Sequence, residues 1–301
     1  MAPTPTTDRD HDDIFDRGLQ FDMSTLLGRR RLLSVVAGAG AVAVLAACGA
    51  DKGGSGTTAT TGATGTSGST AGTAATTAAA ASDPTATMTA TADASCSPIP
   101  EETAGPYPGD GSNGPDILAE SGVVRSDITA SFGSSTNVAE GVPLTIELTI
   151  TDTASDCAPL AGAAVYLWHC DRDGNYSMYT APDENYLRGV QETDADGRVA
   201  FTSIFPACYA GRWPHIHFEV YPDLAATSDA DNQLATSQLA LPQDTCEVVY
   251  ATDGYEQSVR NLSQVSLDRD NVFSDDQAAH QLATMTGTVA DGYTAALALA
   301  V

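Results

Sequence analysis

Apolar and polar residues alternate along several stretches in the second half of the chain. From Leu144 to Thr151, apolar side chains at every second position alternate with Thr and Glu, which is the period of a half-buried β-strand. Further strand-like runs cover residues 164–170, 198–204, 284–289 and 293–299. Turn signals separate these runs, and no long amphipathic helical pattern is present. The pattern predicts an all-β fold, built as an antiparallel β-sandwich.

Acidic residues and glycine mark the expected turns. Residues 194–197 and the pair Asp291-Gly292 have the composition of hairpin turns. Residues 171–175 resemble the start of a calcium-binding EF-hand loop. However, Tyr176 stands where that loop requires glycine, and no helices flank it, so we expect an ordinary turn.

The N-terminal region has the pattern of an export signal. Arg29-Arg30-Arg31 precede residues 34–47, an apolar run that is too short and too rich in Ala and Gly for a membrane span. We therefore assign residues 1–47 to an N-terminal region with a twin-arginine signal. Leu45-Ala46-Ala47-Cys48 has the form of a lipoprotein cleavage box, so Cys48 would carry a lipid anchor as the protein's membrane contact. The alternative is an ordinary cleavage nearby that leaves Cys48 unmodified or removes it.

Composition divides the remainder of the chain. Residues 48–95 are almost entirely Gly, Ser, Thr and Ala, which bury too little apolar surface to offset the entropy of ordering them. We expect a flexible tether there, followed by one domain at residues 96–301 that is long enough for a single core. The net charge is −26, and Lys52 is the single lysine. Nucleic-acid binding needs basic clusters, so this charge argues against a nucleic-acid partner.

The chemistry of the expected domain is concentrated between Phe205 and Tyr221. His215 and His217 lie two residues apart in an apolar, strand-like run, so both imidazoles face one side of the sheet while Ile216 faces the other. Two imidazoles on one strand face make half of a metal site. The other ligands must come from elsewhere in the chain.

Four spaced blocks carry a resemblance to a known family. The blocks are Glu102–Tyr107, Ala164–Tyr176, Tyr209-x-Gly-Arg212-x-x-His215-x-His217 and Thr236–Leu239. In this order they resemble the intradiol ring-cleavage dioxygenases, and in particular the secreted bacterial branch of that family. These are non-haem iron(III) enzymes that open catechol-type rings between the two hydroxylated carbons. The resemblance extends from Cys96 to the C-terminus.

The resemblance implies a metal site with four protein ligands. It assigns Tyr176, Tyr209, His215 and His217 to a non-haem Fe(III), with Tyr209 leaving the metal and taking a proton when substrate binds. A hard trivalent cation favours phenolate over phenol strongly enough to offset the ordinary tyrosine pKa of about 10. The resemblance also assigns Arg212 to stabilise negative charge that develops on the substrate ring. A salt bridge with a surface carboxylate is the alternative for Arg212.

The resemblance further implies a substrate pocket and a reaction. Gly105, Pro106, Tyr107 and Gln238 are the expected pocket residues; taken alone, the Gly-Pro segment would be a simple entry loop. The expected partners are a small aromatic diol and O₂. The expected product is a muconate-type dicarboxylic acid.

Five cysteines follow Cys48, which in an exported protein allows at most two disulfides. Cys157 and Cys246 lie in loop-like segments that flank the core, and we expect them to pair. Cys170 and Cys208 stand beside proposed site residues, but a soft thiolate suits a hard ferric ion poorly.

Two other functions fit parts of the pattern. An extracytoplasmic β-sandwich could bind a metal or a catechol without catalysis, but such a carrier needs neither Arg212 nor an exchangeable Tyr209. Cupin-type metalloenzymes also use a His-x-His pair, but they normally add a carboxylate and a third histidine. His169 follows Trp168 on a strand that we expect to be buried, so we predict that His169 is a hydrogen-bonded core residue. The sequence leaves the ring substituents and the oligomeric state open.

Overall fold

The computed structural model describes residues 96–301. The predicted signal region, the lipidation site Cys48 and the tether lie outside the described residues, so their assignments stay predictions. The elements in chain order are β1 (Pro143–Asp152), η1 (Thr153–Ser155), β2 (Ala158–Pro159), β3 (Ala164–Trp168), β4 (Arg188–Glu192), β5 (Arg198–Ile204), β6 (His215–Tyr221), η2 (Ala225–Ser228), η3 (Ala230–Asn232), β7 (Ala235–Ala240), α2 (Gln243–Tyr250), α3 (Glu256–Leu262), η4 (Phe273–Asp275), β8 (Thr284–Thr288) and β9 (Gly292–Ala300).

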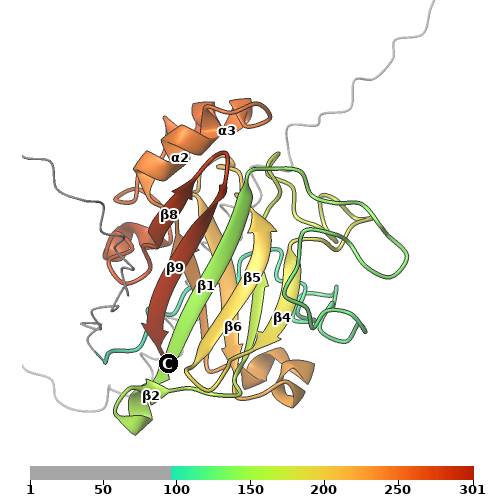
Figure 1. Ribbon diagram of the computed structural model, residues 1–301, viewed down its shortest axis with the longest axis vertical. Coiled ribbons are helices and arrows are strands. Elements are labelled where there is room, and N and C mark those ends of the chain that lie inside the picture. The colour runs from blue at the N-terminus through green and yellow to red at the C-terminus, as the bar shows by residue number, and fades with distance from the viewer. Residues whose placement is uncertain (1–95) are drawn as a thin grey trace, which may run out of the picture. The chain divides into compact units, whose positions relative to one another are not determined.

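Two β-sheets form the described domain, as the alternating pattern predicts. One sheet has the strand order β2-β1-β9-β8, with β5 also paired to β1, and the other has the order β4-β3-β6-β7. Figure 1 shows the first sheet in front, with β6 of the second sheet behind it, and the helices α2 and α3 beyond one end of the strands. The fold is therefore a β-sandwich with short helices at its edge.

The apolar positions of the strands meet between the two sheets. Leu144, Ile146 and Leu148 on β1 belong to the same buried cluster as Ile216 and Phe218 on β6. All five side chains have 1% or less of their surface exposed. Since successive side chains of a strand point to opposite faces, this packing turns His215 and His217 to the outer face of their sheet.

The predicted antiparallel arrangement is wrong for one strand pair. β1 and β9 pair in parallel, in a register that joins Leu144 to Tyr293, whereas the other named pairs of the described residues are antiparallel. Parallel neighbours need a long crossover connection, and here the chain between β1 and β9 contains strands of both sheets. Local alternation cannot reveal such a pairing, because it carries no information about strand direction.

The turn at residues 194–197 forms, but it is not a hairpin turn. Gly197 has a φ of 73° and donates its N–H to the Asp194 carbonyl, as expected for a tight turn. The turn leads from β4 in one sheet to β5 in the other, so it crosses the sandwich. By contrast, Asp291-Gly292 does join the antiparallel strands β8 and β9, as predicted. The expected turn at residues 171–175 is also present, with the Asp171 carboxylate accepting the N–H groups of Asp173 and Asn175.

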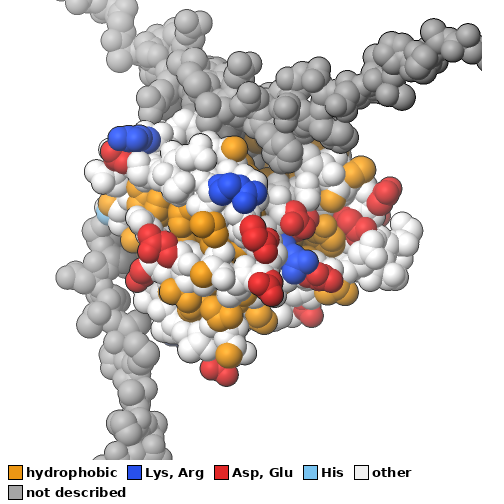
Figure 2. Space-filling model, turned by 90° about the horizontal axis from the view of Figure 1, so that it is seen from above, with side chains coloured by type: hydrophobic (Ala, Val, Ile, Leu, Met, Phe, Trp, Pro, Cys, Tyr) orange, Lys and Arg blue, Asp and Glu red, His pale blue; other side chains and the backbone are white. Residues whose placement is uncertain are grey.

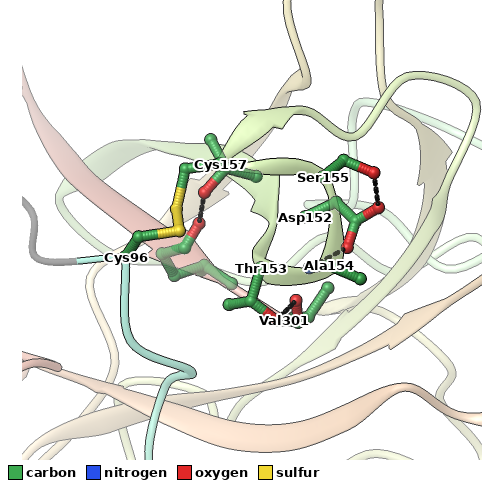
Figure 3. The surroundings of a disulfide bond; sticks show 9 residues. Cys96, Asp152, Thr153, Ala154, Ser155, Cys157 and Val301 are labelled. Atoms are coloured by element: carbon green, nitrogen blue, oxygen red, sulfur yellow. Dashed lines mark hydrogen bonds between the residues drawn. A yellow bond between two sulfur atoms is a disulfide. The ribbon is translucent and has the colours of Figure 1, made fainter.

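The predicted disulfide between Cys157 and Cys246 is wrong. Cys157 pairs with Cys96, and their Cα atoms lie 5.7 Å apart (Figure 3). The N–H of Ile99 donates to the carbonyl of Ala300, which places the start of the domain beside the turn after β1. Cys246 lies within α2 instead of a loop and is fully buried as a free thiol.

The surface carries many carboxylates and few cations. On the face shown in Figure 2, acidic side chains are spread among apolar ones, and the basic side chains do not gather into one patch. Among residues 96–301, no helix has the length and apolar character needed to cross a membrane.

Candidate metal centre

The two histidines of β6 converge on the outer face of the four-stranded sheet. Their Nε2 atoms lie 3.1 Å apart, and both side chains are almost completely buried. The Nδ1 atom of His215 donates to the carbonyl of Trp213 at 2.5 Å, which leaves its Nε2 atom as a lone-pair donor. The imidazole of His217 stacks on Trp168, with ring centroids 4.9 Å apart and planes 6° from parallel. The strand and its neighbours therefore fix both rings with their Nε2 atoms toward one point.

Two tyrosines from separate loops complete the cluster. The Tyr209 hydroxyl lies 3.1 Å from His215 Nε2, and the Tyr176 ring lies 6.0 Å from the Tyr209 ring and 6.2 Å from the His217 ring. Tyr176 has 3% of its surface exposed, whereas Tyr209 is half-buried. The four residues expected as ligands are thus brought together from two loops and one strand.

Burial keeps this cluster uncharged in the absence of a cation. It raises the pKa of Tyr176 well above its ordinary value, with a further contribution from the neighbouring Tyr209. Burial likewise lowers the pKa of His215 and His217 well below the ordinary histidine value, and Arg212 adds to this effect. The imidazoles therefore remain neutral with their lone pairs available.

The donor set fits a hard metal ion. The Tyr176 hydroxyl and His217 Nδ1 have no hydrogen-bond partner among the described residues, although both are buried. A buried hydroxyl without a partner is costly, and a cation that favours the phenolate would account for it. Within residues 96–301, no three His, Cys, Asp or Glu side chains are grouped as a metal site, so such a centre depends on the tyrosines.

Arg212 lies beside the histidines and is buried, so the alternative of a surface salt bridge is wrong. Its Nε atom donates to the Asp270 carboxylate at 3.0 Å, and one terminal nitrogen donates to Gln238 Oε1 at 2.7 Å. Gln238 is itself fully buried and stands opposite His217 in the β6–β7 register. Its amide nitrogen donates to the carbonyl of Thr103, which ties Arg212 to the segment expected to cover the pocket.

The expected pocket segment lies against the tyrosine cluster. The Tyr107 ring stands 5.1 Å from the Tyr176 ring and 4.9 Å from the Tyr179 ring. Gly105 has a φ of 72°, a conformation that favours glycine, and its N–H donates to the Thr103 hydroxyl. Pro106 accepts a hydrogen bond through its carbonyl from the side chain of Asn113. The structure thus brings Tyr107 directly to a candidate ligand, and holds residues 105 and 106 in the turn beside it.

Comparisons with known proteins agree with this architecture. A family model described as "Dioxygenase" matches residues 113–245, which include all four candidate ligands. The described fold is similar to the solved structure of an intradiol ring-cleavage dioxygenase from Tetranychus urticae, with 26% identity and a TM-score of 0.53. The match covers 68% of this chain and 94% of that one. Residues 113–245 thus match a dioxygenase family, and the described fold is similar to that of an intradiol ring-cleavage dioxygenase.

Curated relatives match this domain over shorter segments. Chlorocatechol 1,2-dioxygenase of Rhodococcus opacus is 39% identical over 62 residues, which are 20% of this chain and 23% of that protein. Hydroxyquinol 1,2-dioxygenase of Corynebacterium glutamicum is 32% identical over 100 residues, which are 27% of this chain and 33% of that protein. The chain thus spans a third or less of the length of these two relatives.

His169 does not join the candidate metal centre, in agreement with the prediction. Its Nδ1 atom donates to the carbonyl of Cys170, and its Nε2 atom accepts from the hydroxyl of Ser203. Burial lowers the pKa of His169 to about 4. Both ring nitrogens are therefore used within the core.

Two charged residues that hold the candidate metal centre in place were not predicted from the sequence. Arg188 is buried and donates to the carbonyl of Tyr107 and to the carbonyl and hydroxyl of Ser177, the neighbour of Tyr176. Asp270 is the carboxylate partner of Arg212. Neither residue lies in a block with a chemical signature, and each contacts residues that are far away in sequence.

Proposed function

We propose that this protein is a non-haem iron(III) dioxygenase that cleaves catechol-type rings between the two hydroxylated carbons with O₂. The observation that carries the proposal is the convergence of Tyr176, Tyr209, His215 and His217 at one buried point. Two phenolates and two neutral imidazoles form a donor set suited to Fe(III), because phenolate oxygen stabilises a hard trivalent ion. When bound, Fe(III) supplies a Lewis acid that would bind the substrate oxygens and activate the ring toward O₂.

The tyrosines have different roles in this proposal. Tyr176 is almost fully buried and would remain a fixed ligand. Tyr209 is half-buried, so it is the tyrosine that an entering substrate can reach and displace. Its phenolate oxygen would then take a proton from a substrate hydroxyl, which favours binding of the diol as an anion.

Arg212 supplies the positive charge of the site. Its guanidinium is held by Asp270 and Gln238 at a fixed place, and it is almost completely buried, where a charge acts more strongly than in water. Negative charge that develops on the substrate ring would be stabilised there without reorganisation of the arginine. A non-catalytic carrier would have no use for this fixed cation.

Catechol-type substrates are the class that we propose. The two curated relatives named above are described as acting on chlorocatechol and hydroxyquinol, which are both aromatic diols or triols. The aromatic faces of Tyr107 and Tyr176 provide an apolar wall for such a ring. A muconate-type dicarboxylic acid would be the product.

We also propose that the enzyme works outside the cytoplasm. The arginine cluster at residues 29–31 supports twin-arginine export, and Cys48 would carry a lipid anchor. The disulfide between Cys96 and Cys157 supports an oxidising compartment. The anchor predicts that the parent protein is processed in a globomycin-sensitive way and carries radiolabelled lipid, and that Cys48→Ser shows neither property. Unchanged lipid labelling of Cys48→Ser would contradict the anchor.

The reaction is tested with ¹⁸O₂. The full chain, reconstituted with Fe(III), is mixed with catechol while oxygen uptake and the product mass are followed. The proposal predicts one O₂ consumed for each catechol and both labelled atoms in the dicarboxylic acid. A protein that binds iron and catechol but consumes no oxygen would point to the carrier alternative.

A further inference from the structure

Asp270 connects two parts of the candidate centre through one carboxylate. The residue lies between α3 and η4 and has 2% of its surface exposed. Its Oδ2 atom accepts from Arg212 Nε at 3.0 Å and from the N–H of Trp213 at 2.6 Å. Its Oδ1 atom accepts from the N–H groups of Val272 and Phe273, at 2.9 and 3.1 Å. Two donors from a distant chain segment and two from the turn that follows Asp270 therefore converge on a single side chain.

The first consequence concerns the orientation of Arg212. The guanidinium is anchored at Nε by Asp270 and at a terminal nitrogen by Gln238, so two acceptors fix its plane. Phe273, which Asp270 holds through its N–H, packs against the same guanidinium at 5.9 Å from the ring centroid. Charge-assisted hydrogen bonds of this kind are stronger than those between neutral groups, and burial shields them from water.

The second consequence concerns His215. Trp213 donates its backbone N–H to Asp270, and its backbone carbonyl accepts from His215 Nδ1. One residue thus transmits the position of the carboxylate to the imidazole whose Nε2 atom faces the cluster. A hydrogen bond to the distal nitrogen of a metal-binding histidine fixes both its tautomer and the direction of its lone pair.

We infer that Asp270 is a positioning residue that aligns Arg212 and His215 relative to each other. It touches neither substrate nor reacting atoms; it sets the distance between the fixed cation and one ligand of the centre. The part that concerns Arg212 rests on the proposed function, because the cation matters only if charge develops on a bound ring. The part that concerns His215 needs only that the cluster binds a metal ion.

Asp270→Asn is the sharpest substitution for this inference. Asparagine has the same shape but only one acceptor oxygen, and its NH₂ group would face two donors. In one orientation the contacts to Arg212 and Trp213 are lost; in the other, the contacts to Val272 and Phe273 that hold the side chain in place are lost. Both orientations also remove the negative charge that faces Arg212, so both disturb the alignment. Asp268→Asn is the matched control, since Asp268 is exposed in the same loop, two residues away.

The test combines Asp270→Asn, Arg212→Lys and the double variant in the full chain loaded with Fe(III). We expect each single variant to lower kcat for catechol about 10- to 100-fold, as is typical when the partner that orients a site residue is lost. In the Arg212→Lys background, Asp270→Asn should lower kcat by clearly less than it does in the parent, because the part of its effect that acts through Arg212 is already gone and only the part that acts through His215 remains. A merely structural role would instead give effects that multiply in the double variant, and this result would overturn the inference.

Binding of Ga(III), a non-redox ion of similar charge, gives a readout that does not depend on catalysis. Asp270→Asn should bind Ga(III) about tenfold more weakly through the disturbed His215, whereas Arg212→Lys and Asp268→Asn should bind it like the parent. If the parent binds Ga(III) but its Fe(III)-loaded form does not cleave catechol, the proposed function is wrong. The Ga(III) binding of the variants still tests the role of Asp270 in that case. If the parent is active and Asp270→Asn matches it in both assays, the inference alone is wrong.

A measurement on the parent covers the case in which Asp270→Asn does not fold. In the Ga(III)-loaded protein, the Arg212 Nε–H resonance, assigned by its loss in Arg212→Lys, should persist at pH 8 because the buried carboxylate holds the proton from exchange. An Arg212 Nε–H that exchanges as fast as those of exposed arginines would show that Asp270 does not hold the guanidinium, and the inference would fall.

Discussion

The two faces of the β4-β3-β6-β7 sheet are both buried, but they are built from opposite chemistry. The inner face contributes Ile216 and Phe218 to an apolar core shared with β1. The outer face carries His215, His217 and Gln238, whose polar atoms meet residues from distant loops. The same strand thus supports a core on one side and a candidate metal centre on the other.

The difference shows which kind of information each face needs. An apolar face needs only volume and shape, so alternation of residue types predicts it from local sequence. A buried polar face needs a partner for each polar atom, and those partners come from far along the chain. The outer face is therefore specified by tertiary contacts that no local pattern contains.

The largest effect is expected when a ligand is removed from the outer face. His215→Ala should retain less than about a tenth of the parent's iron, since loss of even an outer partner of a metal ligand costs about 10- to 100-fold in affinity. Catechol cleavage should be lost with the metal, while the fold remains. Iron quantification and far-UV circular dichroism check this, with the exposed His280→Ala as control. Full iron content in His215→Ala would mean that the ligand assignment is wrong.

A cavity on the inner face should act on stability instead of on metal binding. Phe218→Ala should lower the free energy of unfolding by about 3 to 5 kcal/mol, because its side chain is fully buried in the shared core. Chemical denaturation measures this change, with Val248→Ala as control because Val248 is 53% exposed. At low denaturant, the folded fraction should still bind iron stoichiometrically. Equal losses in Phe218→Ala and Val248→Ala would contradict the assignment of the core.

Tyr209→Phe should separate metal binding from turnover. The variant keeps the ring but loses the oxygen that is proposed to take a substrate proton, so kcat/KM should fall about 100-fold while part of the iron remains bound. Tyr293→Phe, on the other sheet, is the matched control. Parent-like kinetics in Tyr209→Phe would remove this residue from the proposed chemistry.

His169, the buried histidine outside the candidate metal centre, should give an effect that is confined to acid pH. Burial lowers its pKa to about 4 in the folded protein, against an ordinary value of 6.5. Below pH 6.5 the unfolded chain therefore binds a proton that the folded protein does not, and stability falls as the pH drops from about 6.5 to about 4. The contribution of His169 to this fall is roughly 3 kcal/mol.

Substitution of His169 isolates that contribution. The stability difference between the parent and His169→Gln, measured by denaturation from pH 7.5 to pH 4, cancels the titration of the groups that both proteins share. We expect the difference to shrink by roughly 3 kcal/mol toward acid pH. A difference that is independent of pH would show that His169 titrates alike in both states.

Sequence reasoning succeeded where the structure depends on local patterns. Alternation predicted β1, β5 and the β8–β9 pair, and the two-residue spacing placed His215 and His217 on one face. The helices α2 and α3 were missed, because eight and seven residues give too few turns for a helical period to stand out.

The disulfide and the roles of Asp270 and Arg188 were not predicted, because each depends on contacts between residues far apart in the sequence. The disulfide joins Cys96 to Cys157 because the start of the domain lies against the end of β9, a contact between opposite ends of the domain. Asp270 reaches Arg212 across 58 residues, and Arg188 reaches the carbonyl of Tyr107 across 81. The family resemblance supplied the loop tyrosines, since spacing alone could not bring Tyr176 to the histidines.

We propose that the outer face holds Fe(III) on two tyrosinates and two histidines. The most direct measurement is the visible absorption spectrum of the purified protein, with iron quantified in the same sample, before and after anaerobic addition of catechol. We expect a red-brown tyrosinate-to-iron band that shifts when catechol binds. When air is admitted, the shifted band should decay while a muconate forms. A protein that stays colourless and inactive after reconstitution with iron would contradict it.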